Sequence, residues 1–313
     1  MNRPYMTIAA VERETGLSKD TLRVWERRYG FPTPERDGNG ERIYAPEQVD
    51  KLRLVRRLMD RGYRPGRLLG IGDEALASLA APAPSGEAPS PAAKGAARLA
   101  GASEAGALCQ QVLELVRRHD VAALRHALHQ AMVRQGLGRF VTDTVAPLNS
   151  AVGNAWMSGA FQVFEEHLYT EQMQAVLRQA IATLPAADAR PRMLLTTVPD
   201  EQHILGLLMA ECLFALEGAS CVSLGTQTPL YDIRLAAEAQ GADVVALSFS
   251  AAFPQRQVAP LLTQLRGLLP AGIALWAGGS GVERLGELPG VKCYVRLDEA
   301  VQALRDWRAQ AAS

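Results

Sequence analysis

The sequence predicts several domains: an α-helical winged helix-turn-helix, a four-helix bundle and an α/β doubly wound domain of Rossmann-like, flavodoxin-like type. Its 313 residues exceed one ordinary hydrophobic core. Hydrophobic residues make up 48% and charged residues 21%, as in folded soluble proteins. Apolar spacing changes along the chain from helical periodicity to short runs. The expected domains are 1–72, 107–188 and 189–313, joined by a flexible linker over 73–106 that is rich in Ala, Pro, Gly and Ser.

Charge is unevenly distributed along the chain. Residues 1–71 hold thirteen Arg and two Lys against ten Asp and Glu, a formal charge of +5, whereas the whole chain has none. This favours a polyanion as partner of the N-terminal end. No stretch approaches the roughly 18 apolar residues of a membrane span, and no signal-peptide core precedes the first domain. We expect a cytoplasmic protein with reduced, buried cysteines.

The first thirty residues follow the pattern of a helix-turn-helix. Gly16 can supply the sharp turn, and Ser18 can cap a second helix in which Leu22 and Trp25 face the core. Arginine side chains on the outer face can bind phosphates and guanine edges in the major groove. The candidate DNA-binding residues of this helix are Lys19, Thr21, Arg23, Arg27 and Arg28.

A β-wing is predicted next, with a Gly-Asn-Gly tip between Arg36 and Arg42. Pro46 then opens a helix with a stripe of apolar residues at core spacing: Val49, Leu52, Val55 and Leu58. With the string TLRVWERRYGF and the sequence Arg-Ile-Tyr that ends at Tyr44, residues 6–70 strongly resemble the DNA-binding domain of the MerR superfamily. The resemblance implies a double-stranded DNA operator as partner, contacted also by Arg36, Arg42 and Tyr44.

Two further patterns predict the remaining domains. Residues 107–185 place apolar side chains three and four apart, with breaks near Asp120, Gly136 and Gly159, which indicates about four helices. After Pro191, five short apolar runs alternate with helical stretches: MLLTTV, ASCVSLG, DVVALSFS, IALWAG and VKCYV. Such alternation predicts a parallel sheet covered on both faces, which binds ligands at the carboxyl ends of its strands.

A histidine stands at the end of the first of these strands, in the sequence Glu201-x-His203-x-x-Gly206. Its imidazole can ligate a metal, while the carboxylate two residues earlier can accept the other ring N–H and hold the tautomer. Ser248 and Ser250 follow the third run, and Gly278 and Gly279 follow the fourth.

These residues resemble the motif D-x-H-x-x-G, S-x-L and G-G of the cobalamin-binding domain in methionine synthase and the cobalamin mutases. Glu201 replaces the aspartate, and Ser250 replaces the leucine. The resemblance implies that His203 is the lower axial ligand of cobalt. It also implies that the dimethylbenzimidazole tail leaves cobalt and lies beside the sheet, where paired glycines allow close approach.

A second signal lies in the bundle, where nine residues separate Trp156 from Glu166 and His167. An indole and a polar pair can cover an amphipathic group. The spacing resembles the W-x9-E-H motif of light-responsive MerR regulators of the CarH/LitR type, in which it caps the deoxyadenosyl group of adenosylcobalamin. Val163 is assigned to the same cap. Met157 departs from this type, whose light sensors have there a histidine that ligates cobalt after illumination.

The resemblance implies a photoreceptor that regulates transcription and is not an enzyme. We expect a repressor whose adenosylcobalamin and light response act through a homo-oligomer, a dimer or tetramer. One alternative is a MerR-type regulator that senses cobalamin, redox state or another chromophore. Another is a corrinoid-dependent enzyme or shuttle, which is disfavoured because the chain lacks a barrel segment of about 250 residues. His119, His126 and His129 receive no function.

Overall fold

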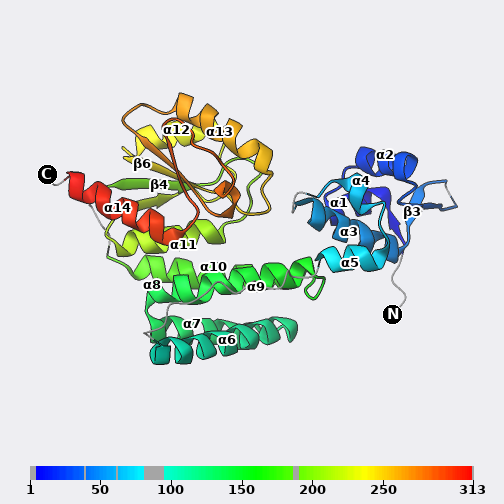
Figure 1. Cartoon of the computed structure of the whole chain (residues 1–313), viewed down its shortest axis with the longest axis horizontal. Helices are drawn as coiled ribbons and strands as arrows, with labels where there is room; N and C mark the ends of the chain where they lie inside the picture. Colours follow the sequence, from blue (N-terminus) through cyan, green and yellow to red (C-terminus); the bar gives the residue numbers. More distant parts are fainter. Residues whose placement is uncertain (1–4, 39, 61–62, 81–94, 186–189, 312–313) are drawn as a thin grey trace. The chain divides into compact units, whose positions relative to one another are not determined.

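A computed structural model describes residues 5–38, 40–60, 63–80, 95–185 and 190–311. They form two compact units, which Figure 1 traces along the chain. The first unit contains Met1–Ser90 and Asn154–Phe161, and the second contains Pro91–Gly153 and Gln162–Ser313. Over the described residues, no helix combines the length and apolar character that crossing a membrane requires.

The first unit contains the predicted winged helix-turn-helix. Gly16 ends the first helix with a left-handed φ of 66°, and the Ser18 side chain accepts from Thr21 N at 3.2 Å to start the second. Its helices are α1 (Ile8–Thr15), α2 (Lys19–Tyr29), α3 (Pro46–Asp60), α4 (Pro65–Leu68) and α5 (Asp73–Ala80). The antiparallel sheet has the order β1-β3-β2, with β1 (Met6–Thr7), β2 (Glu35–Arg36) and β3 (Arg42–Tyr44).

The wing and the core of this unit follow the predicted pattern. Arg36 pairs with Arg42 across the β2–β3 hairpin, whose tip residue Asn39 lies outside the described residues. Leu22 and Trp25 are buried as predicted, and so is the α3 stripe of Val49, Leu52, Val55 and Leu58.

The start of the predicted linker differs from expectation, because α5 occupies Asp73–Ala80. Leu76 is 1% exposed and belongs to the core of the first unit, against which Leu79 also packs. Asp73 pairs with Lys51 of α3 at 2.6 Å. The helix forms because these tertiary contacts add to a local sequence free of proline. Residues 81–94 of the predicted linker lie outside the described residues, and the next helix begins at Gly95.

The second unit begins with the expected four helices. They are α6 (Gly95–Arg117), α7 (Val121–Gln135), a third helix in three parts and α10 (Val163–Thr183). The third helix comprises α8 (Leu137–Arg139), the π turn η1 (Phe140–Val145) and α9 (Ala146–Met157), whose end groups with the first unit. Pro147 has no N–H to donate to a carbonyl of the preceding turn. The π turn η1 ends directly before this part of the helix and accommodates the missing hydrogen bond. Asp120 caps α7, close to where a break is predicted.

All five predicted strands form one parallel sheet of the order β5-β4-β6-β7-β8, which is the flavodoxin-like order. Figure 1 shows α12 and α13 on one face and α11 and α14 on the other. The strands are β4 (Arg192–Thr196), β5 (Ser220–Ser223), β6 (Val244–Ser248), β7 (Ala274–Gly278) and β8 (Val291–Tyr294). The helices are α11 (Leu205–Leu216), α12 (Leu230–Ala239), α13 (Gln255–Leu268), the short η2 (Ser280–Val282) and α14 (Leu297–Ala311).

Replacement of Leu76 tests whether α5 is part of the core of the first unit. Leu76→Ala should destabilise that unit by about 2–5 kcal/mol, because it leaves a cavity in a buried core. Hydrogen exchange of α1 and α3 amides in the full-length protein measures the change. Glu74→Ala, at an exposed position of the same helix, is the matched control. Equal exchange in the two variants would show that α5 does not belong to this core.

Candidate functional site

The candidate cofactor site lies at the carboxyl edge of the sheet. The loop from β4 to α11 carries Glu201 and His203, and the loop after β6 carries Ser250. Because β4 and β6 are adjacent parallel strands, both loops leave the sheet at the same edge. The structure brings the three side chains together there.

The Glu201 carboxylate is the centre of this cluster. It is 1% exposed and accepts four hydrogen bonds. Oε1 accepts from the backbone N of His203 at 2.9 Å and lies 2.7 Å from its Nδ1, and Oε2 accepts from the N and Oγ of Ser250 at 2.8 and 2.9 Å. Burial opposes ionisation, but the bonds from His203 and Ser250 outweigh it, so the pKa of Glu201 lies below its ordinary value.

An ionised Glu201 determines the tautomer of His203. A carboxylate only accepts, so Nδ1 must carry the proton, and the lone pair that a metal ligand needs is then on Nε2. The His203 side chain is 58% exposed, while its carboxylate partner is buried. Both Glu201 oxygens already accept two hydrogen bonds each. The donor set therefore fits one axial imidazole ligand, with the carboxylate as its support.

Sequence reasoning missed two supports of this loop. Ser250 was predicted as a cofactor-binding residue at the leucine position of the motif, but not as a partner of Glu201; its Oγ donates to Glu201 and lies 3.0 Å from His203 Nδ1. Thr197 is fully buried, donates to the carbonyl of Glu201 at 2.6 Å and accepts from Gln227 N at 2.8 Å. A polar pair at the end of an apolar strand, as in Thr196-Thr197, was the available signal.

Contacts within the chain require glycine at positions 279 and 281, and the place of Gly278 and Gly279 beside a nucleotide tail stays a prediction. A Cβ on Gly279, whose φ is +98°, would lie 2.4 Å from the carbonyl O of Phe249, and one on Gly281 would lie 2.6 Å from its Cβ. Phe249, the residue that follows β6, therefore occupies the space beside Gly279 and Gly281, and a side chain at either position would collide with it. Gly278 has more room, with its nearest neighbour at 3.4 Å. A Cβ on Gly206 would meet Ser248 Oγ at 2.9 Å, which brings these two predicted residues together.

The bundle residues predicted for the upper face lie at the start of α10. Val163 is its first residue, and Glu166 and His167 follow in the first turns. Glu166 Oε1 accepts from Thr170 Oγ1 at 2.7 Å, and Oε2 lies 3.6 Å from His167 Nε2. Trp156 belongs to α9, in the segment that groups with the first unit.

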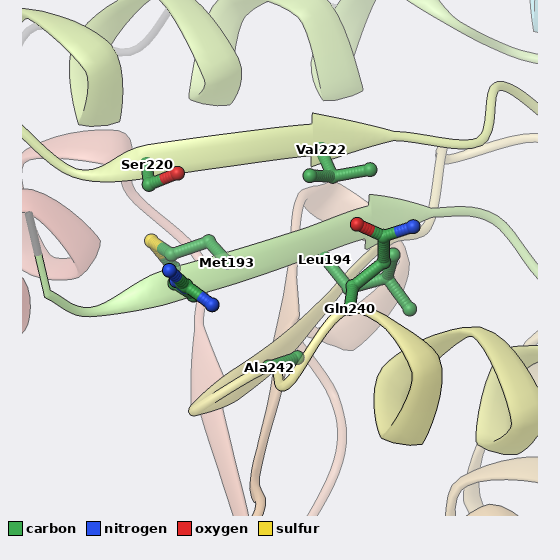
Figure 2. Close-up of a pocket in the computed structure, with 7 residues that line it drawn as sticks. Met193, Leu194, Ser220, Val222, Gln240 and Ala242 are labelled. Atoms are coloured by element: carbon green, nitrogen blue, oxygen red, sulfur yellow. The ribbon is translucent and has the colours of Figure 1, made fainter. Parts of the chain in front are cut away.

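A shallow hollow of about 240 Å³ lies elsewhere on the sheet (Figure 2). It involves the first residues of β4 and β5 and the turn that leads from α12 toward β6, and no predicted site residue lines it. Ligands of such sheets bind at the opposite, carboxyl edge. Its lining residues are Arg192, Met193, Leu194, Ser220, Val222, Gln240 and Ala242.

The candidate nucleic-acid interface is the outer face of α2. Arg23, Arg27 and Arg28 are exposed there, and Arg23 pairs only loosely with the exposed Asp20 at 3.3 Å. Lys19 and Thr21 stand in the first turn, where Thr21 Oγ1 lies 2.9 Å from Ser18 Oγ. These residues remain DNA-binding candidates.

Two residues of the wing that were predicted to contact DNA, Arg42 and Tyr44, interact with the protein itself instead. Tyr44 is fully buried in the core of the first unit, so its prediction as a DNA-binding residue is wrong. Arg42 forms a two-pronged ion pair with Glu26 of α2, at 3.0 and 3.4 Å, which ties the wing to this helix. The side chain of Arg36 donates to Gly40 O at 2.7 Å and remains exposed.

Substitutions of Arg23 and Tyr44 distinguish a residue that contacts DNA from one that packs in the core. Arg23→Ala should weaken binding to double-stranded DNA by about 1–3 kcal/mol. Tyr44→Phe should leave binding unchanged and the free energy of unfolding equal or up to about 1 kcal/mol higher, since the buried hydroxyl has no hydrogen-bond partner among the described residues. Fluorescence anisotropy with a duplex selected by the protein measures affinity. Lost affinity in a stable Tyr44→Phe protein would contradict the assignment.

Removal of the negative charge at Glu201 tests its four hydrogen bonds. In Glu201→Gln an amide N–H₂ faces donors, so the free energy of unfolding should fall by about 1–3 kcal/mol. Asp200→Asn is the matched control, since Asp200 is exposed and its φ of 68° suits asparagine. Urea unfolding checks both variants. Identical midpoints would rule out a structural role for the carboxylate.

Comparison with known proteins agrees with this geometry. The MerR HTH regulatory protein family matches residues 6–68, and the B12 binding domain family matches residues 108–181. The monomethylamine corrinoid protein of Methanosarcina barkeri aligns with a TM-score of 0.50 and 15% identity over 63% of this chain and 96% of its own, which shows a shared fold.

Two relatives from Myxococcus xanthus match most of the chain. The HTH-type transcriptional repressor CarH is 29% identical over 265 residues, 85% of each chain. The HTH-type transcriptional repressor CarA is 30% identical over 279 residues, 88% of this chain and 87% of its own. Both are repressors rather than enzymes. The chain belongs to the family of HTH-type transcriptional repressors that includes CarH and CarA, with a MerR HTH segment followed by a B12-binding domain.

Proposed function

We propose that this protein is a cytoplasmic repressor whose affinity for its DNA operator depends on bound adenosylcobalamin and on light. One observation carries the proposal. The same chain presents an exposed arginine-bearing helix and, at the carboxyl edge of a parallel sheet, an imidazole held by a buried carboxylate. The first arrangement suits the major groove, and the second suits an axial ligand of cobalt.

Each group of residues has a proposed part. His203 would supply the imidazole ligand for the cobalt of a bound cobalamin, and Glu201 and Ser250 hold its ring. Gly206, Ser248, Gly278 and Gly279 line the side of the sheet that receives the nucleotide tail. Trp156, Val163, Glu166 and His167 are assigned to the adenosyl group by the spacing of their motif, with Glu166 binding hydroxyls.

The response to light would come from the cofactor, which when bound supplies a cobalt–carbon bond that light can break. Glu166 and the other cap residues would hold the adenosyl group in the dark and would lose this contact once that bond is broken. The proposed homo-oligomer is stabilised by the intact cap, and several DNA-binding units in one assembly bind an operator more tightly than one. Dissociation of the assembly therefore releases the operator.

A second candidate function keeps cobalamin and DNA but lacks a light response based on two histidines. Met157 favours it, because a thioether is a weaker ligand than imidazole where the light sensors have histidine. Thiol redox sensing has less support, because desolvation raises the pKa of Cys212 and of Cys221 to about 12. It also raises the pKa of the half-buried Cys109 and of Cys293, which is exposed rather than buried as expected. Reactive cysteines instead have depressed pKa values.

Reconstitution with adenosylcobalamin in darkness tests the proposal. The dark protein should bind the cofactor, elute as an oligomer in size-exclusion chromatography and bind DNA, and green light should change all three readouts together. His203→Ala should weaken uptake at least about tenfold, because it removes the axial ligand. His126→Ala, at an exposed position of α7, is the control. Uptake without any response to light would favour the second candidate, and no uptake would overturn both.

A further inference from the structure

His119 received no function from the sequence, yet it lies in a specific place. It occupies the turn between α6 and α7 with a left-handed φ of 56°. Non-glycine residues adopt this conformation uncommonly. The turn holds it through hydrogen bonds from His119 N to Val116 O and from Val121 N to His119 O, at 3.0 and 3.1 Å. The imidazole is thereby directed at another helix of the bundle.

The imidazole of His119 contacts two consecutive residues in the first turn of α10. Its Nε2 lies 3.3 Å from Glu165 Oε1, and its ring lies 5.1 Å from the ring of Phe164 at a tilted angle of 58°. These residues are 45 and 46 positions away in the sequence. A polar contact and a ring contact on adjacent residues therefore link the α6–α7 turn to the start of this helix.

Glu165 extends the contact to the first backbone group of the helix. It is 9% exposed, and its Oε2 accepts from Gln162 N at 2.7 Å in a capping box. The carboxylate therefore joins the α6–α7 turn on one oxygen and the N-terminus of α10 on the other. Neither contact uses the residues proposed to meet the cofactor.

The next two residues are Glu166 and His167, the pair proposed to cover the adenosyl group. Glu166 Oε1 also accepts a hydrogen bond from Thr170 Oγ1, four residues further along α10, at 2.7 Å. A binding residue is effective when its neighbours hold it in place before the ligand arrives. We infer that His119 is a positioning residue for the upper-ligand cap: through Phe164 and Glu165 it holds the first turn of α10 so that Glu166 and His167 are presented to the adenosyl group. This inference rests on the proposed function.

A pair of isosteric substitutions separates positioning from backbone strain. Asparagine tolerates the left-handed conformation, but its amide nitrogen corresponds to Nδ1 and does not reach Glu165. The amide nitrogen of glutamine corresponds to Nε2 and keeps this hydrogen bond. His126→Asn on α7 is the matched control, because that histidine is exposed. Phe164→Leu, at a side chain that is 55% exposed, probes the ring contact with little risk to folding.

The experiment measures the Kd of the full-length protein for adenosylcobalamin and for hydroxocobalamin in darkness. His119→Asn should weaken adenosylcobalamin binding about fivefold, the equivalent of one hydrogen bond, and leave hydroxocobalamin binding within about twofold. His119→Gln should retain most of the affinity, Phe164→Leu should show a smaller loss in the same direction, and His126→Asn should show none.

Three results would overturn the inference. Unchanged adenosylcobalamin affinity in both His119→Asn and Phe164→Leu would remove the positioning role. An equal loss for the two cobalamins, with a lower unfolding midpoint, would show that His119 only stabilises the bundle. If the unaltered protein bound neither cobalamin, the proposed function itself would fail, which differs from a protein that binds both but does not respond to these variants.

Discussion

The buried carboxylate of Glu201 is the constraint on which the candidate cofactor site depends. A charge that is 1% exposed is costly unless it is fully hydrogen-bonded, and four donors from His203 and Ser250 meet this requirement. The same bonds orient the imidazole and join the loops after β4 and β6. The hydrogen bonds that allow this charge to be buried are therefore also the ones that orient the imidazole.

The DNA-binding unit has a related arrangement, in which a basic side chain pairs with a carboxylate of the protein and so connects the wing to α2. Arg42 of the wing pairs with Glu26 of α2, while Tyr44 packs in the core beneath. The exposed arginines of α2 then project from a helix whose position is already determined. A basic surface divides in this way into residues that hold the interface together and residues that are available to phosphates.

The bundle follows the same principle at the start of α10. Glu165 faces inward to His119 and to the helix N-terminus, whereas its neighbour Glu166 is partly exposed beside His167. Adjacent residues of a helix point about 100° apart, so one carboxylate can be structural while the next is available to a ligand. All three sites thus pair an accessible side chain with a buried or paired partner.

Local patterns determined much of this protein from the sequence alone. Apolar periodicity predicted the α3 stripe, the four-helix bundle and all five strands, and Ser18, Gly16 and Asp120 marked helix ends because caps act within one turn. The pairing of Glu201 with His203 was also predictable, since only one residue separates them. Only the tertiary structure decided that α5 belongs to the first core, that Tyr44 is buried, that Ser250 supports Glu201 and that His119 meets Glu165. These contacts join residues tens of positions apart, and burial and side-chain direction depend on the packing of whole elements, which no local spacing encodes.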